Sequence, residues 1–157
     1  MKHVDPKVFL IAYTHLDDAA VKLWLDHVGG LKALDHITGD DGEQLIELAG
    51  RNCYRSFDLG INPNISKIRT DSSEYHKNIL NSAHGSVLEH ATCSFAFEDC
   101  SRVVTHELVR HRSGTAFAQV SLRYVRLNDI PMWIPDIISD NKEALAVFEE
   151  VIEKCEW

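Results

Sequence analysis

The stretch ATCSFAFEDCSRVVTHELVRHR, residues 91–112, contains the two patterns that set the fold of this chain. Residues 91–98 alternate in polarity, which predicts a half-buried strand. One face of this strand is apolar and consists of Ala91, Cys93, Phe95 and Phe97. Ser101 can then cap a helix that runs through Arg110 or His111. The pattern therefore predicts a strand followed directly by a helix that ends in Arg-His-Arg.

The charge around this helix is unusual for the chain. Five of the eight arginines lie between Arg102 and Arg126, together with no lysine and a single acid, Glu107. The chain as a whole carries a formal net charge of −8, which argues against nonspecific binding to nucleic acid or to anionic lipid. Because arginine pairs with phosphate or carboxylate through a planar fork, the cluster indicates a small, defined anionic ligand.

Apolar periodicity and capping residues predict four further helices, at 16–28 (capped by Asp17), 43–57, 71–85 and 139–157. In the helix at 71–85, Asp71 and Glu74 form a capping-box pattern and Gly85 is a suitable terminating residue. Ser86 and Glu89 repeat the capping-box pattern immediately afterwards. Turn-forming residues predict loops at 39–42, 58–66 and 112–116, and the prolines at 130–135 predict irregular structure.

The bulk properties are those of a single globular domain spanning residues 1–157. No apolar run reaches membrane-spanning length and residues 1–10 do not resemble a secretory signal, so a cytoplasmic location is the default expectation. The four cysteines form no C-x-x-C pair, and we expect them to be reduced and partly buried.

The sequence gives little support for a metal site or for a catalytic nucleophile. His106 and His111 are five residues apart, about 140° around a helix, so they cannot share a metal as the two histidines of a zinc protease helix do. A looser metal site would need ligands without regular spacing, namely His84, His90, Cys93 and Cys100. We therefore expect no metal, and we assign no catalytic residue.

The residues after the helix suit binding rather than covalent catalysis. Glu107, Arg110 and His111 share one helix face, an arrangement that is often only a surface ion pair. Ser121 lacks a G-x-S-x-G elbow, and between Gln119 and Arg123 it is better suited to hydrogen-bond a phosphate or a base.

Taken together, AHGSVLEHATCSFAFEDCSRVVTHELVRHRSGTAFAQVSLRYVRL, residues 83–127, resembles the signature region of the flavin-dependent thymidylate synthases. The shared features are His-x-x-x-x-Glu-His, a strand, a helix, Arg-His-Arg and Ser-x-Arg-Tyr. Residues 48–60 look like an earlier helix and turn of that family. Two differences are visible: eight residues rather than seven separate Arg-His-Arg from the serine, and Glu107 stands where many members have glutamine.

The resemblance implies an α+β fold, with a mixed or antiparallel sheet flanked by helices. It implies reductive methylation of dUMP to dTMP, with FAD as the bound cofactor, methylenetetrahydrofolate as carbon donor and NADPH as reductant. It also implies a homotetramer whose active sites are shared between subunits.

By position, the resemblance assigns cofactor binding to Arg110, His111, Arg112, His84, Ser86 and Gln119. It assigns dUMP binding to Glu107, Arg110, Gln119, Ser121 and Arg123. His84 and Ser86 would reach the flavin and folate region from a neighbouring subunit.

Family members are longer than 157 residues, so we expect this chain to correspond to the N-terminal part of the family fold. An arginine that polarises the uracil has no match in it, and we expect little turnover by the chain alone. Two alternatives remain open: a relative that binds nucleotide or flavin without catalysis, and one half of a split enzyme that needs a second chain.

Overall fold

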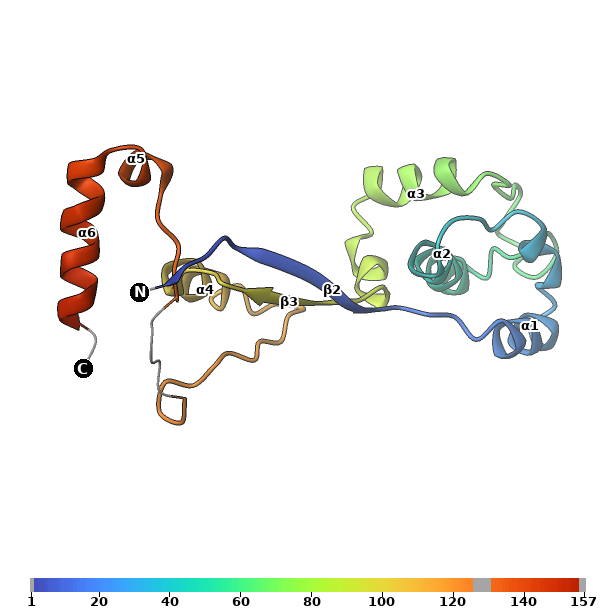
Figure 1. Cartoon of the computed structure of the whole chain (residues 1–157). Coiled ribbons are helices and arrows are strands. Elements are labelled where there is room, and N and C mark those ends of the chain that lie inside the picture. The colour runs from blue at the N-terminus through green and yellow to red at the C-terminus, as the bar shows by residue number, and fades with distance from the viewer. Residues whose placement is uncertain (1, 126–130, 156–157) are drawn as a thin grey trace. The chain divides into compact units, whose positions relative to one another are not determined.

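The computed structural model describes residues 2–125 and 131–155, and in them the chain is an α+β protein (Figure 1). Strands β1 (Lys2–His3) and β4 (Pro131–Met132) form one two-stranded parallel sheet, in which Lys2 pairs with Pro131 and His3 with Met132. Strands β2 (Lys7–Tyr13) and β3 (Cys93–Glu98) form a second. No helix of the described residues is long and apolar enough to cross a membrane.

The chain divides into two compact units. We call residues 10–94 the core unit, and residues 1–9 with 95–157 the signature unit. The boundary falls within both β2 and β3. The expectation of one domain spanning residues 1–157 stays a prediction.

The core unit is built from helices around two buried clusters. Its elements are α1 (Asp18–His27), the 3-10 helix η1 (Leu31–Asp35), α2 (Asp41–Tyr54), α3 (Ser72–Asn81) and the 3-10 helix η2 (Gly85–His90). The larger cluster consists of Leu16, Leu25, Ala33, Ile37, Leu48 and Phe57. The smaller cluster, Tyr75, Ile79 and Val87 with Ile46 against it, joins α2, α3 and η2. Apolar burial thus supplies this unit with a core of its own.

Acidic caps begin the helices of the core unit largely as expected. The Asp17 carboxylate accepts a hydrogen bond from the backbone N–H of Ala20, and Asp71 accepts one from Glu74. Asp40 and Glu43 form a reciprocal capping box, so α2 starts inside the segment predicted as a loop at 39–42.

Two sequence expectations around residue 85 are wrong. Helix α3 ends at Asn81, because Ala83 takes a left-handed conformation (φ 55°) two residues before Gly85. Ser86 and Glu89 form no capping box, since they lie inside η2, which has no side-chain cap.

The signature unit contains α4 (Arg102–Leu108), α5 (Asp136–Ser139) and α6 (Lys142–Cys155). Ser101 caps α4 as expected, accepting a hydrogen bond from the N–H of Val103, but the helix ends at Leu108, before Arg110. The amphipathic helix predicted at 139–157 is confirmed as α6, although residues 156 and 157 lie outside the described residues. Pro131–Met132 forms a short strand, so the prediction of irregular structure is wrong there, and residue 130 lies outside the described residues.

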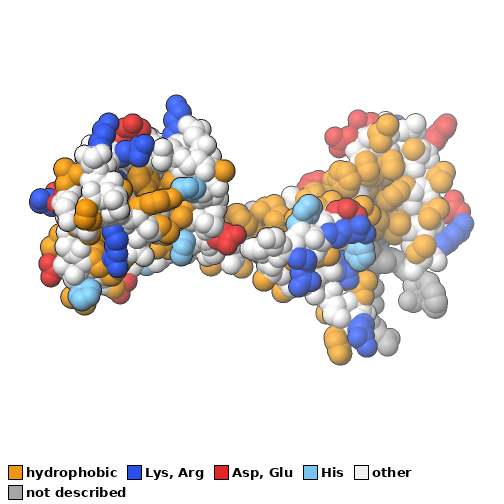
Figure 2. Space-filling view, turned by 180° about the vertical axis from the view of Figure 1, so that it is seen from behind, with side chains coloured by type: hydrophobic (Ala, Val, Ile, Leu, Met, Phe, Trp, Pro, Cys, Tyr) orange, Lys and Arg blue, Asp and Glu red, His pale blue; other side chains and the backbone are white. Residues whose placement is uncertain are grey.

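Burial of strand β3 and of the cysteines differs from expectation. The strand at 91–98 is confirmed as β3, but Phe95 and Phe97 are 50% and 47% exposed in the described structure, so the half-buried prediction is wrong. The cysteines are free as expected, but Cys53, Cys93 and Cys155 are exposed rather than partly buried. Figure 2 shows hydrophobic side chains on the surface at the end of the chain formed by α5 and α6, where Val147 and Val151 are exposed.

Candidate functional site

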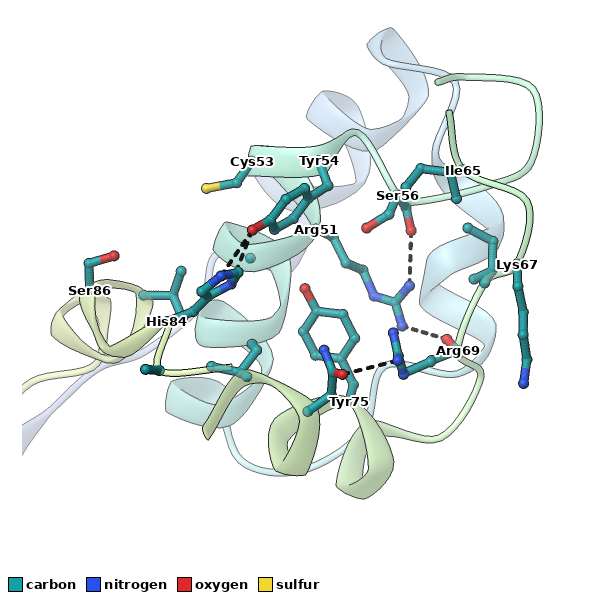
Figure 3. A pocket seen from close by; sticks show the side chains of 16 residues that line it. Arg51, Cys53, Tyr54, Ser56, Ile65, Lys67, Arg69, Tyr75, His84 and Ser86 are labelled. Carbon is teal, nitrogen blue, oxygen red and sulfur yellow. Dashed lines mark hydrogen bonds between the residues drawn. The ribbon is translucent and has the colours of Figure 1, made fainter. Parts of the chain in front are cut away.

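The core unit contains a pocket of about 460 Å³, a size typical of small-molecule sites. Its walls come from the C-terminal half of α2, the segment 56–69, α3, and the residues from Ala83 to Val87 (Figure 3). The pocket lies entirely within residues 50–87, so the packing of the core unit alone shapes it.

Arg51 organises one wall of the pocket. Its side chain is 1% exposed, and its Nε and Nη2 atoms donate to Oε1 of the equally buried Glu47 at 2.8 and 2.5 Å. The same guanidinium donates to the backbone carbonyls of Ser56 (3.0 Å) and Arg69 (2.7 Å). Residues 47 and 51 are one helical turn apart, which brings the two side chains together. Arg51 therefore fixes the irregular segment 56–69 against α2.

Tyr75 of α3 lies beneath this arginine, with the guanidinium carbon 4.6 Å from the ring centroid. Burial raises the pKa of the Tyr75 phenol to about 12, so the hydroxyl is neutral near neutral pH. Gly50 allows α2 and α3 to approach here, since a Cβ at this position would lie 2.6 Å from the Tyr75 hydroxyl oxygen. Close helix packing thus forms the floor of the pocket.

An aromatic pair lies at the other side of the pocket. The rings of Tyr54 and His84 are stacked, with centroids 5.7 Å apart and planes 15° apart. The Tyr54 hydroxyl lies 3.1 Å from Nδ1 of His84, within hydrogen-bonding distance (Figure 3). Ser86 lines the same pocket. Two of the predicted cofactor residues, His84 and Ser86, therefore line the same pocket.

The cationic part of the pocket was not predicted. Lys67 and Arg69 line it, and Nη2 of Arg69 donates to Oδ1 of Asn78 at 3.0 Å. None of the lining residues is an aspartate or a glutamate. Apolar residues do not recur at a regular spacing in the segment from 58 to 69, so the sequence does not predict where the side chains of Lys67 and Arg69 lie. An i, i+4 glutamate–arginine pair on the apolar face of α2 is the one signal that could have revealed Arg51.

The remaining predicted residues lie in the signature unit, in α4 and the segment after it. Arg110 is exposed, and its Nε lies 3.8 Å from Oε1 of Glu107, also exposed. His111 and Arg112 follow at the turn after α4 and are exposed as well. An exposed ion pair of this length contributes about 0.3 kcal/mol, so it leaves Arg110 available to a ligand.

Two side-chain hydrogen bonds fold the following segment back on α4. The amide of Gln119 donates to the Thr105 hydroxyl, and Nη2 of Arg102 donates to the carbonyl of Val120 at 3.1 Å. At the next residue, the Ser121 hydroxyl accepts a hydrogen bond from the backbone N–H of Arg123. Gln119, Ser121 and Arg123 thus belong to the same exposed loop as Arg-His-Arg.

The described residues contain no cluster of three or more histidine, cysteine, aspartate or glutamate side chains that could hold a metal ion. The donor set is instead that of an anion site: arginine forks, an amide and a hydroxyl.

Comparison with known proteins places this chain in a family. The family model described as thymidylate synthase complementing protein matches residues 33–156. The chain therefore belongs to this family.

Curated relatives carry the name flavin-dependent thymidylate synthase. One from Mycolicibacterium vanbaalenii is 41% identical over 114 residues, which are 73% of this chain and 43% of the relative. One from Mycolicibacterium gilvum is 43% identical over 109 residues, 69% of this chain and 41% of the relative. One from Corynebacterium aurimucosum is 37% identical over 128 residues, 74% of this chain and 49% of the relative. The matched part of this chain thus spans less than half the length of each.

Proposed function

We propose that this chain takes part in the FAD-dependent reductive methylation of dUMP to dTMP. The observation that carries the proposal is the exposed Arg110–His111–Arg112 turn after α4, which shares a loop with Gln119, Ser121 and Arg123. Its relatives are named flavin-dependent thymidylate synthases, which supports a flavin and a uridylate as the ligands.

The residues present suit a flavin nucleotide. Its phosphates are anions, and two arginine forks around a histidine supply charge-assisted donors for them. Arg110, His111 and Arg112 would hold the flavin, with Gln119 beside them. When bound, the flavin supplies the hydride, and the protein positions and polarises the reactants.

The substrate would lie on the same loop. Glu107, Arg110, Gln119, Ser121 and Arg123 would surround dUMP, with Arg123 and Ser121 toward its phosphate or base. His84 and Ser86 would contribute from a neighbouring subunit, toward the flavin and folate.

Further parts of the proposal concern partners. Methylenetetrahydrofolate would donate the carbon and NADPH would reduce the flavin, in a cytoplasmic homotetramer with shared active sites. These remain predictions.

A pair of substitutions tests the assignment of the two ligands. Arg112→Ala removes a phosphate contact and should weaken flavin binding about 10- to 100-fold, measured by quenching of flavin fluorescence on titration with protein. Ser121→Ala and Arg123→Ala should leave flavin binding nearly unchanged and weaken dUMP, measured by calorimetric titration. Equal flavin affinity in the wild type and in Arg112→Ala would overturn the flavin assignment.

Turnover needs a separate assay, because binding alone also fits a non-catalytic relative. dTMP formation with FAD, NADPH and methylenetetrahydrofolate should be measured for the chain alone and after addition of a polypeptide carrying the remaining part of a relative. Activity that appears only on mixing supports the split-enzyme alternative. Flavin and dUMP binding without dTMP in either case would favour the binding-only alternative.

A further inference from the structure

Thr105 lies in the middle of α4 and forms two hydrogen bonds through one hydroxyl group. Its Oγ1 donates to the backbone carbonyl of Arg102, three residues earlier, at 3.1 Å. The same oxygen accepts a hydrogen bond from the side-chain amide nitrogen of Gln119, fourteen residues further along the chain. A hydroxyl group has one proton, so once that proton is given to Arg102 the oxygen can only accept. The group of Gln119 that faces Thr105 must therefore be a donor.

This requirement fixes the orientation of the Gln119 side-chain amide. An amide has an NH2 group that donates and a carbonyl oxygen that accepts. With the NH2 group at Thr105, the carbonyl oxygen Oε1 remains for a ligand, and the Gln119 side chain is exposed. In the reversed orientation Oε1 would face the lone pairs of the Thr105 hydroxyl, which would have to release the Arg102 carbonyl in order to donate to it.

An acceptor complements the other predicted ligand-binding groups of this loop. Arg110, Arg112 and Arg123 can only donate. The Ser121 hydroxyl accepts from the backbone N–H of Arg123, which leaves its proton to donate. Gln119 therefore adds a neutral acceptor to a loop in which the arginines and the serine offer donors.

Uracil and the flavin ring share one group that needs such an acceptor, an imide N–H between two carbonyls. We propose that Thr105 is a positioning residue, whose hydroxyl turns the Gln119 amide so that Oε1 accepts from the imide N–H of the bound ring. This inference rests on the proposed function, under which that ring belongs to dUMP or to the flavin. The arginine and serine donors suit the flanking carbonyls and the phosphates.

Two matched ligand pairs distinguish the two rings. dUMP is compared with its N3-methyl derivative, and FAD with its N3-methyl derivative, each of which carries a methyl group in place of the imide proton. Every compound is titrated calorimetrically into the full chain. Thr105→Val removes the hydroxyl and keeps the β-branched shape of the side chain, whereas Thr105→Ser keeps the hydroxyl. Thr70→Val is the control, because Thr70 is an exposed threonine of the core unit.

The wild type should bind the unmethylated member of one pair more tightly. Thr105→Val frees the amide to reverse, so it should reduce this preference about fivefold, whereas Thr105→Ser and Thr70→Val should keep it. The room that the methyl group needs is the same in all variants, so the difference between Thr105→Val and Thr105→Ser reports the hydrogen bond alone. A change in the dUMP pair assigns the Gln119 carbonyl to uracil, and a change in the FAD pair assigns it to the flavin.

The orientation of the amide is also measurable without a ligand, by nuclear magnetic resonance of an isotope-labelled chain. The two Nε2 protons of Gln119 are assigned by their loss in Gln119→Glu. In the wild type one of them should exchange with water more slowly than the other, because it is bonded to Thr105. Thr105→Val should remove this difference, and Thr105→Ser should keep it.

Two results would overturn the inference alone: a ligand preference that is the same in Thr105→Val as in the wild type, or Gln119 amide protons that do not respond to Thr105→Val. Failure of the proposed function gives a different result. If none of the four compounds bound to the wild type, the proposed function would be contradicted, and the inference would fall with it.

Discussion

The core unit and the signature unit are built on different principles. Nine of the ten buried hydrophobic side chains in the described residues belong to the core unit, and the tenth, Ile134, belongs to the signature unit. The core unit also contains the buried Glu47–Arg51 pair, whereas the ion pair of Glu107 with Arg110 is exposed. The family signature is thus most recognisable where packing is sparsest. A family signature is recognised by residue types at fixed spacings in the sequence. How firmly those residues are held in the structure depends instead on how many of their neighbours are buried.

The two arginine pairs provide the largest expected contrast. Arg51→Met leaves the Glu47 carboxylate buried without its partner and frees two carbonyls, so we expect a loss of about 3–5 kcal/mol in the free energy of unfolding. Arg110→Met, the matched change at an exposed pair, should cost about 0.5 kcal/mol or less. Urea unfolding followed by circular dichroism measures both. Similar losses in the two variants would show that burial does not set the strength of the two ion pairs apart.

A matched pair of leucines tests apolar packing in the same way. Leu48 is 3% exposed and Leu108 is 36% exposed. Leu48→Ala should destabilise the chain by about 2–4 kcal/mol through lost burial and a residual cavity, and Leu108→Ala by about 1 kcal/mol or less. The readout is again the denaturant midpoint. If Leu108→Ala were the more damaging change, the signature unit would have a core that the described residues do not show.

Substitution of Gly50 tests whether the close packing of α2 and α3 forms the floor of the pocket. Alanine normally stabilises a helix interior relative to glycine, by about 1 kcal/mol. Here its Cβ would meet the Tyr75 hydroxyl, so Gly50→Ala should instead cost about 1–3 kcal/mol as α2 and α3 are forced apart. Gly50→Ala combined with Tyr75→Phe, which removes that oxygen, should recover part of the loss. An unchanged or raised midpoint in the single variant would show that the helices separate freely.

The smallest expected effect depends on pH. The backbone N–H of Leu16, with help from His15, lowers the pKa of Asp41 below its ordinary value of 3.8. A lowered folded-state pKa means that the stabilisation is present above the ordinary value and is lost as the pH falls through the lowered one. Asp41→Asn should therefore be less stable than the wild type at about pH 7, and the gap should narrow toward about pH 3. A gap that widens on acidification would contradict this sign.

Sequence reasoning located the helices and strand that have strong local signals. The caps at Asp17, Asp71 and Ser101 and the alternation of residues 91–98 were sufficient to locate these elements, because such signals act over a few residues. Helix α3 ended before the expected glycine, because the left-handed position is taken by Ala83, which no glycine signal marks in the sequence.

The candidate site was less predictable than the elements. His84 and Ser86 do line a pocket, but its cations at 67 and 69 come from a segment without periodicity, which Arg51 positions through backbone carbonyls. The alternation correctly predicted a strand at β3, with Phe95 and Phe97 two residues apart in it. Alternation carries no information about what covers a strand face, and both side chains are exposed in the described structure.

Native-state hydrogen exchange on the full chain, read out by mass spectrometry of peptides, measures the difference in packing between the two units directly. Amides of α2 and α3 should exchange only through global unfolding, whereas amides of residues 109–125 should exchange orders of magnitude faster. Equal protection of residues 109–125 and α2 would contradict the account, because it would require the Arg-His-Arg loop to be packed as firmly as the core unit.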